Sequence, residues 1–345
     1  MTFDIALLLA QDGITNGTIY ALIALAVVLV YTVTRVIFFP QGDFVVYGAL
    51  TLAMLEGGKV PGTVWLVVVL GALAAVLDGF VALRARNFSS LPRSAFINLA
   101  IPAAIAGLVW WLAPLKPPLI LCMVLTILIV LPMGPLIYRL AFHRVAHASS
   151  LVLLIIAVAV HFALNSLGLA IFGTEGHRTQ ALSTTQFNVG ALTISVQSIG
   201  VIVVGLALMA ALYAFFTHTI AGKALRATAV NRLGARLMGI APNTAGAQSF
   251  ALSAGIGAVS GILISPITTI YYDSGLLISL KGLVGAVVAG LASYPLAVCA
   301  AVGVGLMESF ASFWSSEYQE IIVFMLIIPV LLIRSVVSKH HEEEE

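Results

Sequence analysis

Residues 218–245 concentrate the side chains whose types and spacing could bind a partner. The segment carries four basic residues and no acidic one: Lys223, Arg226, Arg232 and Arg236. Apolar residues recur between them at spacings of three and four: Leu225, Ala229, Leu233, Leu237 and Ile240. In a helix these apolar residues would form one stripe beside a basic flank. The pattern predicts a docking surface with the three leucines as buried contacts, the three arginines as rim charges and Lys223 beside them.

A second interpretation of this segment stays open. A basic amphipathic helix can also lie on a membrane surface that carries anionic lipids. Three glycines interrupt the stripe, at Gly222, Gly234 and Gly239. They favour a compact helix-turn-helix that fits a pocket of another protein.

Charged residues within apolar runs are the next candidates, because a charge at the centre of a bilayer costs roughly 2.5–3.5 kcal/mol. Asp43 follows Pro40, Gln41 and Gly42 at the start of a short apolar run. The proline and the glycine indicate a broken helix, whose freed backbone groups could line a polar cavity. Asp43 could instead cap a helix near the cytoplasmic interface.

Lys281 lies in a glycine-rich run, and Glu308 lies in the next apolar run. The two side chains could form a structural ion pair, or Lys281 could face a path for a solute. Four further polar residues could be interhelical hydrogen-bond partners or ligands: Asn16, Tyr20, His161 and Asn165. Our hypothesis is a path lined in part by five residues: Asn16, Tyr20, Gln41, Asp43 and Lys281.

Motifs for catalysis are absent from the sequence. It contains no G-x-x-x-x-G-K-[ST] phosphate loop, no G-x-S-x-G, no H-E-x-x-H and no Cys/His cluster at metal-binding spacing. We therefore expect no catalytic residue, no metal ligand and no bound cofactor, and a protein that is not itself an enzyme. If it drives active transport, the nucleotide must be hydrolysed on another chain.

The composition places these residues in a membrane. Hydrophobic residues make up 61% of the 345 residues and charged residues only 9%, whereas a soluble domain carries about 25% charged residues. The net charge of +2 gives no indication of nucleic-acid binding. Cys122 and Cys299 both lie in apolar runs, where a free cysteine behaves as a small packed hydrophobe. The sequence predicts an all-α polytopic membrane protein.

Apolar runs of about 17–25 residues are long enough to cross a bilayer as helices. Nine runs meet this length approximately: 13–34, 62–83, 95–113, 117–138, 150–172, 194–217, 246–271, 296–314 and 320–337. Two shorter or interrupted runs, 40–55 and 276–293, could be full spans or half-helices. We expect about 9–11 transmembrane or half-membrane helices in one domain, residues 1–345.

Orientation follows from Lys and Arg, which are enriched in cytoplasmic loops. If both short runs cross, twelve of the 16 Lys and Arg residues fall on one side. The twelve are Arg35, Arg84, Arg86, Arg93, Arg139, Arg144, the four basic residues of 218–245, Arg334 and Lys339. Lys59, Lys116 and Arg178 fall opposite. We predict a cytoplasmic loop at 218–245, an outside loop at 173–193, an outside N-terminus and a cytoplasmic C-terminus.

Four blocks of the sequence resemble the permease of branched-chain amino acid-type ABC importers. Asn16–Leu25 is similar to the opening span of that family, and Phe38–Phe44 with Tyr47–Ala49 is similar to its N-F-A-H-G-E-F segment and the G-A that follows. Gly222–Ala227 with Ala235–Ile240 resembles its cytoplasmic ATPase-docking loop. Leu280–Gly290 resembles L-K-A-F-x-x-x-V-L-G-G. Phe38, Pro40 and Gln41 depart from the family pattern near the expected path.

The resemblance implies a type II-like ABC importer permease in a bacterial inner membrane, working by alternating access. Its solute would be a branched-chain amino acid or a related small molecule. The implied partners are a second permease, two ATP-binding subunits that carry ATP and Mg²⁺, and an extracytoplasmic solute-binding protein, with membrane lipid around the spans and no nucleic acid. The alternative is a secondary transporter of a small organic solute driven by an ion gradient. That alternative would leave the basic segment 218–245 unexplained.

Overall fold

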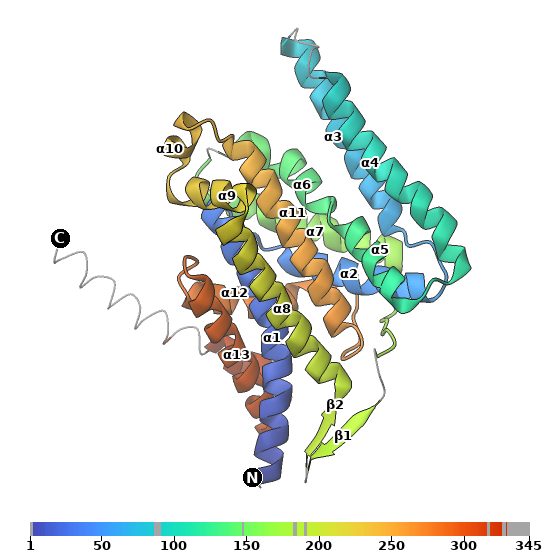
Figure 1. Cartoon of the computed structure of the whole chain (residues 1–345), viewed down its shortest axis with the longest axis vertical. Helices are drawn as coiled ribbons and strands as arrows, with labels where there is room; N and C mark the ends of the chain where they lie inside the picture. The colour runs from blue at the N-terminus through green and yellow to red at the C-terminus, as the bar shows by residue number, and fades with distance from the viewer. Residues whose placement is uncertain are drawn as a thin grey trace, which may run out of the picture. The chain divides into compact units, whose positions relative to one another are not determined.

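The structure is a computed structural model that describes residues 3–85, 91–146, 148–181, 185–189, 192–315, 318–325 and 329 (Figure 1). Its α-helices are α1 Phe3–Thr34, α2 Gln41–Glu56, α3 Thr63–Ala85, α4 Leu91–Leu112, α5 Leu119–Val130, α6 Met133–Ile137, α7 Ser150–Phe172, α8 Val196–His218, α9 Ile220–Val230, α10 Arg232–Leu237, α11 Pro242–Ile264, α12 Gly275–Val288, α13 Tyr294–Trp314 and α14 Gln319–Met325. Short 3-10 turns occupy Ala113–Leu115 and His143–Val145, and a π-helical turn occupies Tyr138–Phe142.

The predicted class, an all-α polytopic membrane protein, is confirmed. Within the described ranges, 8 helical segments are long and apolar enough to cross a membrane. They correspond to the first eight predicted long runs, and the two short runs form α2 and α12. The ninth run, 320–337, is described only over part of α14 and at residue 329, and the rest lies outside the described residues. Arg86, Arg334 and Lys339 also lie outside them.

The boundaries predicted for the first and the seventh long runs were wrong, for local reasons. α1 begins at Phe3 instead of residue 13, because Asp4, Gln11 and Asp12 interrupt the apolar run without interrupting the helix. α11 covers Pro242–Ile264 instead of 246–271. Proline is well suited to the first helical position, which sets the start at Pro242. A second proline, Pro266, has no N–H group to continue the helical hydrogen bonds and ends the helix early.

An apolar face of α3 points away from the protein. The exposed residues recur every three or four positions: Trp65, Val69, Leu73, Val76, Phe80 and Leu83. Exposed apolar surface of this extent is rare in soluble proteins and is expected of a helix that faces lipid. α3 runs beside α4 (Figure 1), whose Trp110 and Trp111 are also exposed.

The segment predicted to be an outside loop, 173–193, contains one β-strand and the start of a second. β1 Gln186–Val189 pairs antiparallel with β2 Leu192–Ser195, with Phe187 opposite Ile194. Apolar residues alternate along both segments, the pattern of a β-hairpin. Earlier in the loop, His177 bridges to Ile270, and the Thr179 and Ser265 hydroxyl groups lie 2.7 Å apart.

The chain divides into two compact units of non-contiguous segments. Unit 1 comprises Met1–Val28, Ala181–Leu212 and Leu280–Glu345, and unit 2 comprises Leu29–Gln180 and Tyr213–Ser279. In unit 2, α2 packs against α11 through three small residues of α11 that the sequence places four apart: Ser253, Gly257 and Gly261. In unit 1, Gly17 of α1 meets Gly305 of α13, and Gly285 of α12 meets Ala301 of α13. Small residues let the helix backbones approach closely in both units.

Candidate functional site

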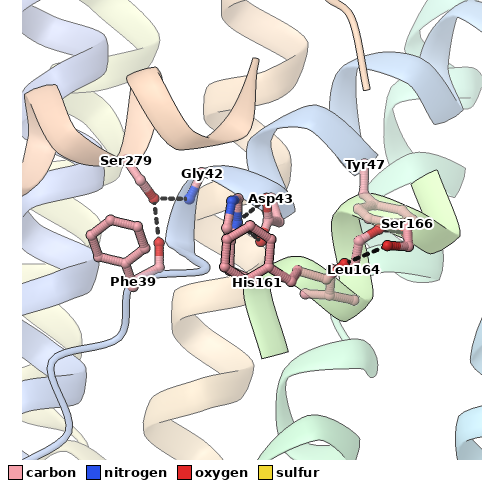
Figure 2. Close-up of polar contacts among 9 residues, drawn as sticks. Phe39, Gly42, Asp43, Tyr47, His161, Leu164, Ser166 and Ser279 are labelled. Atoms are coloured by element: carbon pink, nitrogen blue, oxygen red, sulfur yellow. Dashed lines mark hydrogen bonds and ion pairs between the residues drawn. The ribbon is translucent and has the colours of Figure 1, made fainter. Parts of the chain in front are cut away.

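The break between α1 and α2 in unit 2 is stabilised by Ser279 of α12. The Ser279 hydroxyl group donates to the Phe39 carbonyl oxygen and accepts from the Gly42 N–H, both at 2.6 Å (Figure 2). A Cβ atom on Gly42 would collide with the carbonyl oxygen of Gly275, so only glycine fits there. The predicted broken helix is therefore observed, and its freed backbone groups are hydrogen-bonded to a neighbouring helix, as apolar surroundings require.

The first turn of α2 places Asp43 against His161 of α7. His161 Nδ1 lies 2.8 Å from Asp43 Oδ2 and 3.0 Å from Oδ1, and both side chains are 3% exposed (Figure 2). One turn later, the Tyr47 hydroxyl group donates to the Leu164 carbonyl oxygen of α7 at 2.8 Å. The alternative that Asp43 caps a helix end is not what the structure shows, because its carboxylate pairs with His161.

Gln41 joins the same turn of α2 to α11. Its Nε2 donates to the Ser253 carbonyl oxygen at 3.0 Å, and the Ser253 hydroxyl group donates to Gln41 Oε1. Gln41 is fully buried. Two predicted path residues, Gln41 and Asp43, thus lie close together in unit 2, and each has a partner on a different neighbouring helix.

Three other predicted path residues lie in unit 1. Lys281 Nζ of α12 forms an ion pair with Glu308 Oε1 of α13 at 2.6 Å, which confirms the pairing considered from the sequence. The same Nζ lies 5.7 Å from the ring centroid of Tyr20 on α1, within the range of a cation–π interaction. Asn16 lies one helical turn before Tyr20 and is half-buried.

Segment 218–245 forms two helices, α9 and α10, at the start of α11 (Figure 1). Asn231 separates them with extended backbone angles, φ −148° and ψ 102°, and its side chain caps α10 by accepting from the Gly234 N–H at 2.8 Å. The predicted single apolar stripe is therefore wrong, because an N-cap asparagine starts a second helix. The predicted helix-turn-helix is confirmed.

The docking candidates divide into buried and exposed residues. Leu225 is only 1% exposed, so it packs within the chain and is not available to a partner. Leu233 and Leu237 are 70% and 80% exposed, and Ile220, Val230 and Met238 are still more exposed. Lys223, Arg226 and Arg236 are exposed and Arg232 is half-exposed. None of these four makes an ion pair within the described part of the chain.

A groove of about 470 Å³ separates α9 from α10. Its lining is almost entirely apolar, with one arginine and one asparagine among eight residues: Arg226, Ala227, Val230, Asn231, Gly234, Ala235, Met238 and Ile240. An apolar groove with basic residues around it is able to receive an apolar side chain from an acidic surface. The groove is therefore a second reason, besides the exposed leucines and basic residues, to regard α9 and α10 as a docking element.

Sequence reasoning missed the partners of Gln41, Gly42 and Asp43. His161 was only one of several polar residues in apolar runs, and Ser253 and Ser279 gave no signal beyond the spacing of small residues. Each partner is more than 100 residues from the group that it contacts. Among the described residues, no group of three or more His, Cys, Asp or Glu residues could hold a metal ion.

Comparisons with known proteins agree with one another, because the matching family and the relatives below are all described as branched-chain amino acid transport permeases. The family described as "Branched-chain amino acid transport system / permease component" matches residues 93–331. The high-affinity branched-chain amino acid transport system permease protein LivH of Salmonella typhimurium is 26% identical over 337 residues, covering 93% of this chain and 91% of the relative. LivH of Escherichia coli K12 has the same identity and coverage. The corresponding protein BraD of Pseudomonas aeruginosa is 24% identical over 333 residues, covering 94% and 92%. No solved structure matches the chain.

Proposed function

The chain belongs to the family of branched-chain amino acid transport system permease components, and on that premise we propose that it moves a branched-chain amino acid or a related small solute across the bacterial inner membrane. The movement occurs by alternating access and is driven by ATP hydrolysis on separate subunits. The relatives named above support an importer permease and not the ion-coupled alternative. The multi-pass helical fold is the scaffold that this function needs.

The observation that carries the proposal is the α9–α10 helix pair. It combines exposed leucines, an apolar groove and four basic residues without acidic neighbours. The chain has no nucleotide-binding motif of its own, so the energy must enter through a surface that contacts an ATPase. Leu233 and Leu237 supply the apolar contact in this proposal, and the basic residues Lys223, Arg226, Arg232 and Arg236 pair with an acidic rim on the partner.

The complex that we propose contains this permease, a second related permease, two ATP-binding subunits and an extracytoplasmic solute-binding protein. ATP and Mg²⁺ bind to the ATPase subunits, and this chain binds neither. Closure of the ATPase pair moves α9 and α10, and the movement reaches α11 and α8, which directly adjoin them in the chain. Asn16, Tyr20, Gln41, Asp43 and Lys281 line part of the solute path when it opens.

Co-purification tests the docking role. We expect the solubilised wild-type permease to retain its ATPase subunits and the double variant Leu233→Asp, Arg236→Glu to lose them, because the variant places two negative charges in the contact. The matched control is Leu83→Asp, Arg84→Glu, which makes the same changes at an exposed end of α3. The control is expected to keep the ATPase. Retention by the Leu233→Asp, Arg236→Glu variant, with thermal stability unchanged, would show that α9 and α10 lie on lipid instead.

A further inference from the structure

The hydroxyl group of Tyr138 in unit 2 is buried without a hydrogen bond. Tyr138 begins the π-helical turn Tyr138–Phe142, which follows α6, and its Oη atom has no hydrogen-bond partner among the described residues. A buried hydroxyl group without a partner is costly, and such groups in native proteins need a physical reason. A hydrogen bond that forms only in another state of the protein is one such reason.

A cation with unused donors lies near this hydroxyl group. Arg232, the first residue of α10, is close enough for its charge to act on the Tyr138 hydroxyl group, yet the two are not hydrogen-bonded in this structure. A guanidinium group has several N–H donors, and Arg232 makes no ion pair within the described part of the chain. Gly246 of α11 leaves room for the hydroxyl group, because a Cβ atom there would collide with it. A displacement of α10 toward Tyr138 would therefore bring a charged donor to an unused acceptor.

Aromatic rings connect Tyr138 with the break before α2. The ring centroids of Tyr138 and Phe250 lie 5.1 Å apart, and those of Phe250 and Phe38 lie 4.7 Å apart. Phe142, at the end of the π-helical turn, lies 5.4 Å from Phe250 and 6.0 Å from Phe38. Phe38 also lies 5.5 Å from Phe44 in α2. These rings, which we call the aromatic cluster, form a continuous contact from the π-helical turn to both sides of the break.

The aromatic cluster is suited to transmit a displacement. Each of its residues is at most 2% exposed, and closely packed interiors have low compressibility and pass strain to their neighbours. Gln41 and Asp43 lie in the chain between Phe38 and Phe44, so a shift of these two rings moves the turn that carries both polar residues. Coupling of this kind also needs an element with two discrete arrangements. The Tyr138 hydroxyl group, with or without a bond to Arg232, is such an element, and π-helical turns are frequent at functional sites.

We propose that Tyr138 is a positioning residue that couples α10 to the start of α2. When the ATPase subunits close and move α10, the Arg232 guanidinium group donates a hydrogen bond to Tyr138 Oη, and the aromatic cluster carries the displacement to the break. When the ATPase subunits open, the bond breaks and Tyr138 returns to the arrangement of this structure. This inference rests on the proposed function and adds to it a route that does not follow the chain from α10 into α11.

Tyr138→Phe tests the proposal, because it removes only the hydroxyl group. In a purely structural role its loss would be neutral or stabilising, since the group has no partner to lose. We expect the variant to assemble with its ATPase subunits and to hydrolyse ATP. Its ATP-driven leucine uptake, in proteoliposomes that also contain the binding protein, should fall by about tenfold, the change that one charged hydrogen bond supports. Uptake at the wild-type rate would overturn the proposal. The control is Tyr213→Phe, the same change at an exposed tyrosine of α8, and it should transport like the wild type.

A double-mutant cycle shows whether Tyr138 acts through Arg232. Arg232→Gln removes the charge, and we expect it to reduce leucine uptake per mole of retained ATPase, a measure that any loss of docking does not affect. In the Arg232→Gln background, Tyr138→Phe should cause little further loss, because the two residues share one interaction. Losses that multiply independently would overturn the pairing.

Melting temperatures separate failure of this coupling from failure of the proposed function. A bond that forms only when the ATPase is closed stabilises only the complex with Mg²⁺ and a non-hydrolysable ATP analogue. We expect Tyr138→Phe to melt no lower than the wild type without nucleotide and to gain less from the analogue. If the wild-type complex takes up no leucine, the transport proposal fails, and the melting temperatures still decide the role of Tyr138. If the wild type takes up leucine and Tyr138→Phe matches it in uptake and melting, only the coupling is wrong.

Discussion

At the scale of single residues, the Asp43–His161 pair joins α2 to α7 where α2 begins. Removing one member of a buried pair is more damaging than removing both, because the remaining charge has no partner. We expect His161→Leu to lower the free energy of unfolding by about 3 kcal/mol. The double variant Asp43→Asn, His161→Leu should be less destabilised, since it leaves no charge behind.

Thermal unfolding of the two variants in detergent measures this difference. Ser166→Ala on the same helix is the control, because Ser166 is exposed and its one hydrogen bond among the described residues is to the Phe162 carbonyl oxygen of its own helix. It should change stability by less than about 0.5 kcal/mol. Equal losses for the single and double variants would show that the pair does not stabilise the start of α2.

The sequence indicates which residues matter at this scale but not which residues they contact. Asp43 and Lys281 are conspicuous because they are charged within apolar runs, and Glu308 could be named as a partner because it lies one helix further along the chain. His161 could not be assigned to Asp43, since any polar residue in an apolar run was an equal candidate. Contacts across more than 100 residues depend on how helices pack, which local pattern does not determine.

At the scale of helices, the α2–α11 contact depends on glycines whose Cβ position is already occupied. A Cβ atom on Gly261 would collide with the Val45 carbonyl oxygen, and one on Gly48 would lie 2.9 Å from Ala258 Cα. Backbone atoms cannot move aside as a flexible side chain can. We expect Gly261→Ala to separate the helices and destabilise the protein by about 1–3 kcal/mol, the range for overpacking.

Gly255 on the same helix provides the matched control. Its Cβ position would lie 3.6 Å from Leu131 Cδ1, an ordinary contact. Because alanine favours helix over glycine by about 1 kcal/mol, Gly255→Ala should be neutral or stabilising. The melting temperatures of the two variants, compared in the same detergent, decide the question. A Gly261→Ala variant as stable as Gly255→Ala would mean that α2 and α11 are less tightly packed than described.

The length of the apolar runs predicted where helices exist. It was a poorer guide to where a helix is interrupted. The runs at 150–172 and 194–217 correspond closely to α7 and α8. The continuous stripe across 225–240 was not observed, because Asn231 forms a capping hydrogen bond that starts α10. The spacing of apolar residues predicts which face of a helix is apolar. It does not predict that one side chain, by capping, ends one helix and begins the next.

At the scale of the whole chain, composition alone identifies a polytopic membrane protein, but it does not show how the helices associate. Each compact unit is assembled from segments far apart in the sequence. Apolar runs resemble one another, so nothing in their local pattern assigns Leu280–Glu345 to the same unit as Met1–Val28. The orientation in the membrane, in contrast, is predicted from the sequence, because it depends on where the basic residues lie along the chain.

Orientation is testable with single cysteines in a variant lacking Cys122 and Cys299. Four exposed positions in unit 2 are suitable: Lys59, Lys116, Arg144 and Leu237. The basic residues predict that positions 59 and 116 face outward, and that 144 and 237 face the cytoplasm. A membrane-impermeant maleimide should therefore label the first two in intact cells and the last two only after permeabilisation. Labelling of position 237 in intact cells would place the α10 leucines outside, beyond the reach of any cytoplasmic ATPase, and the docking proposal would fail with the predicted orientation.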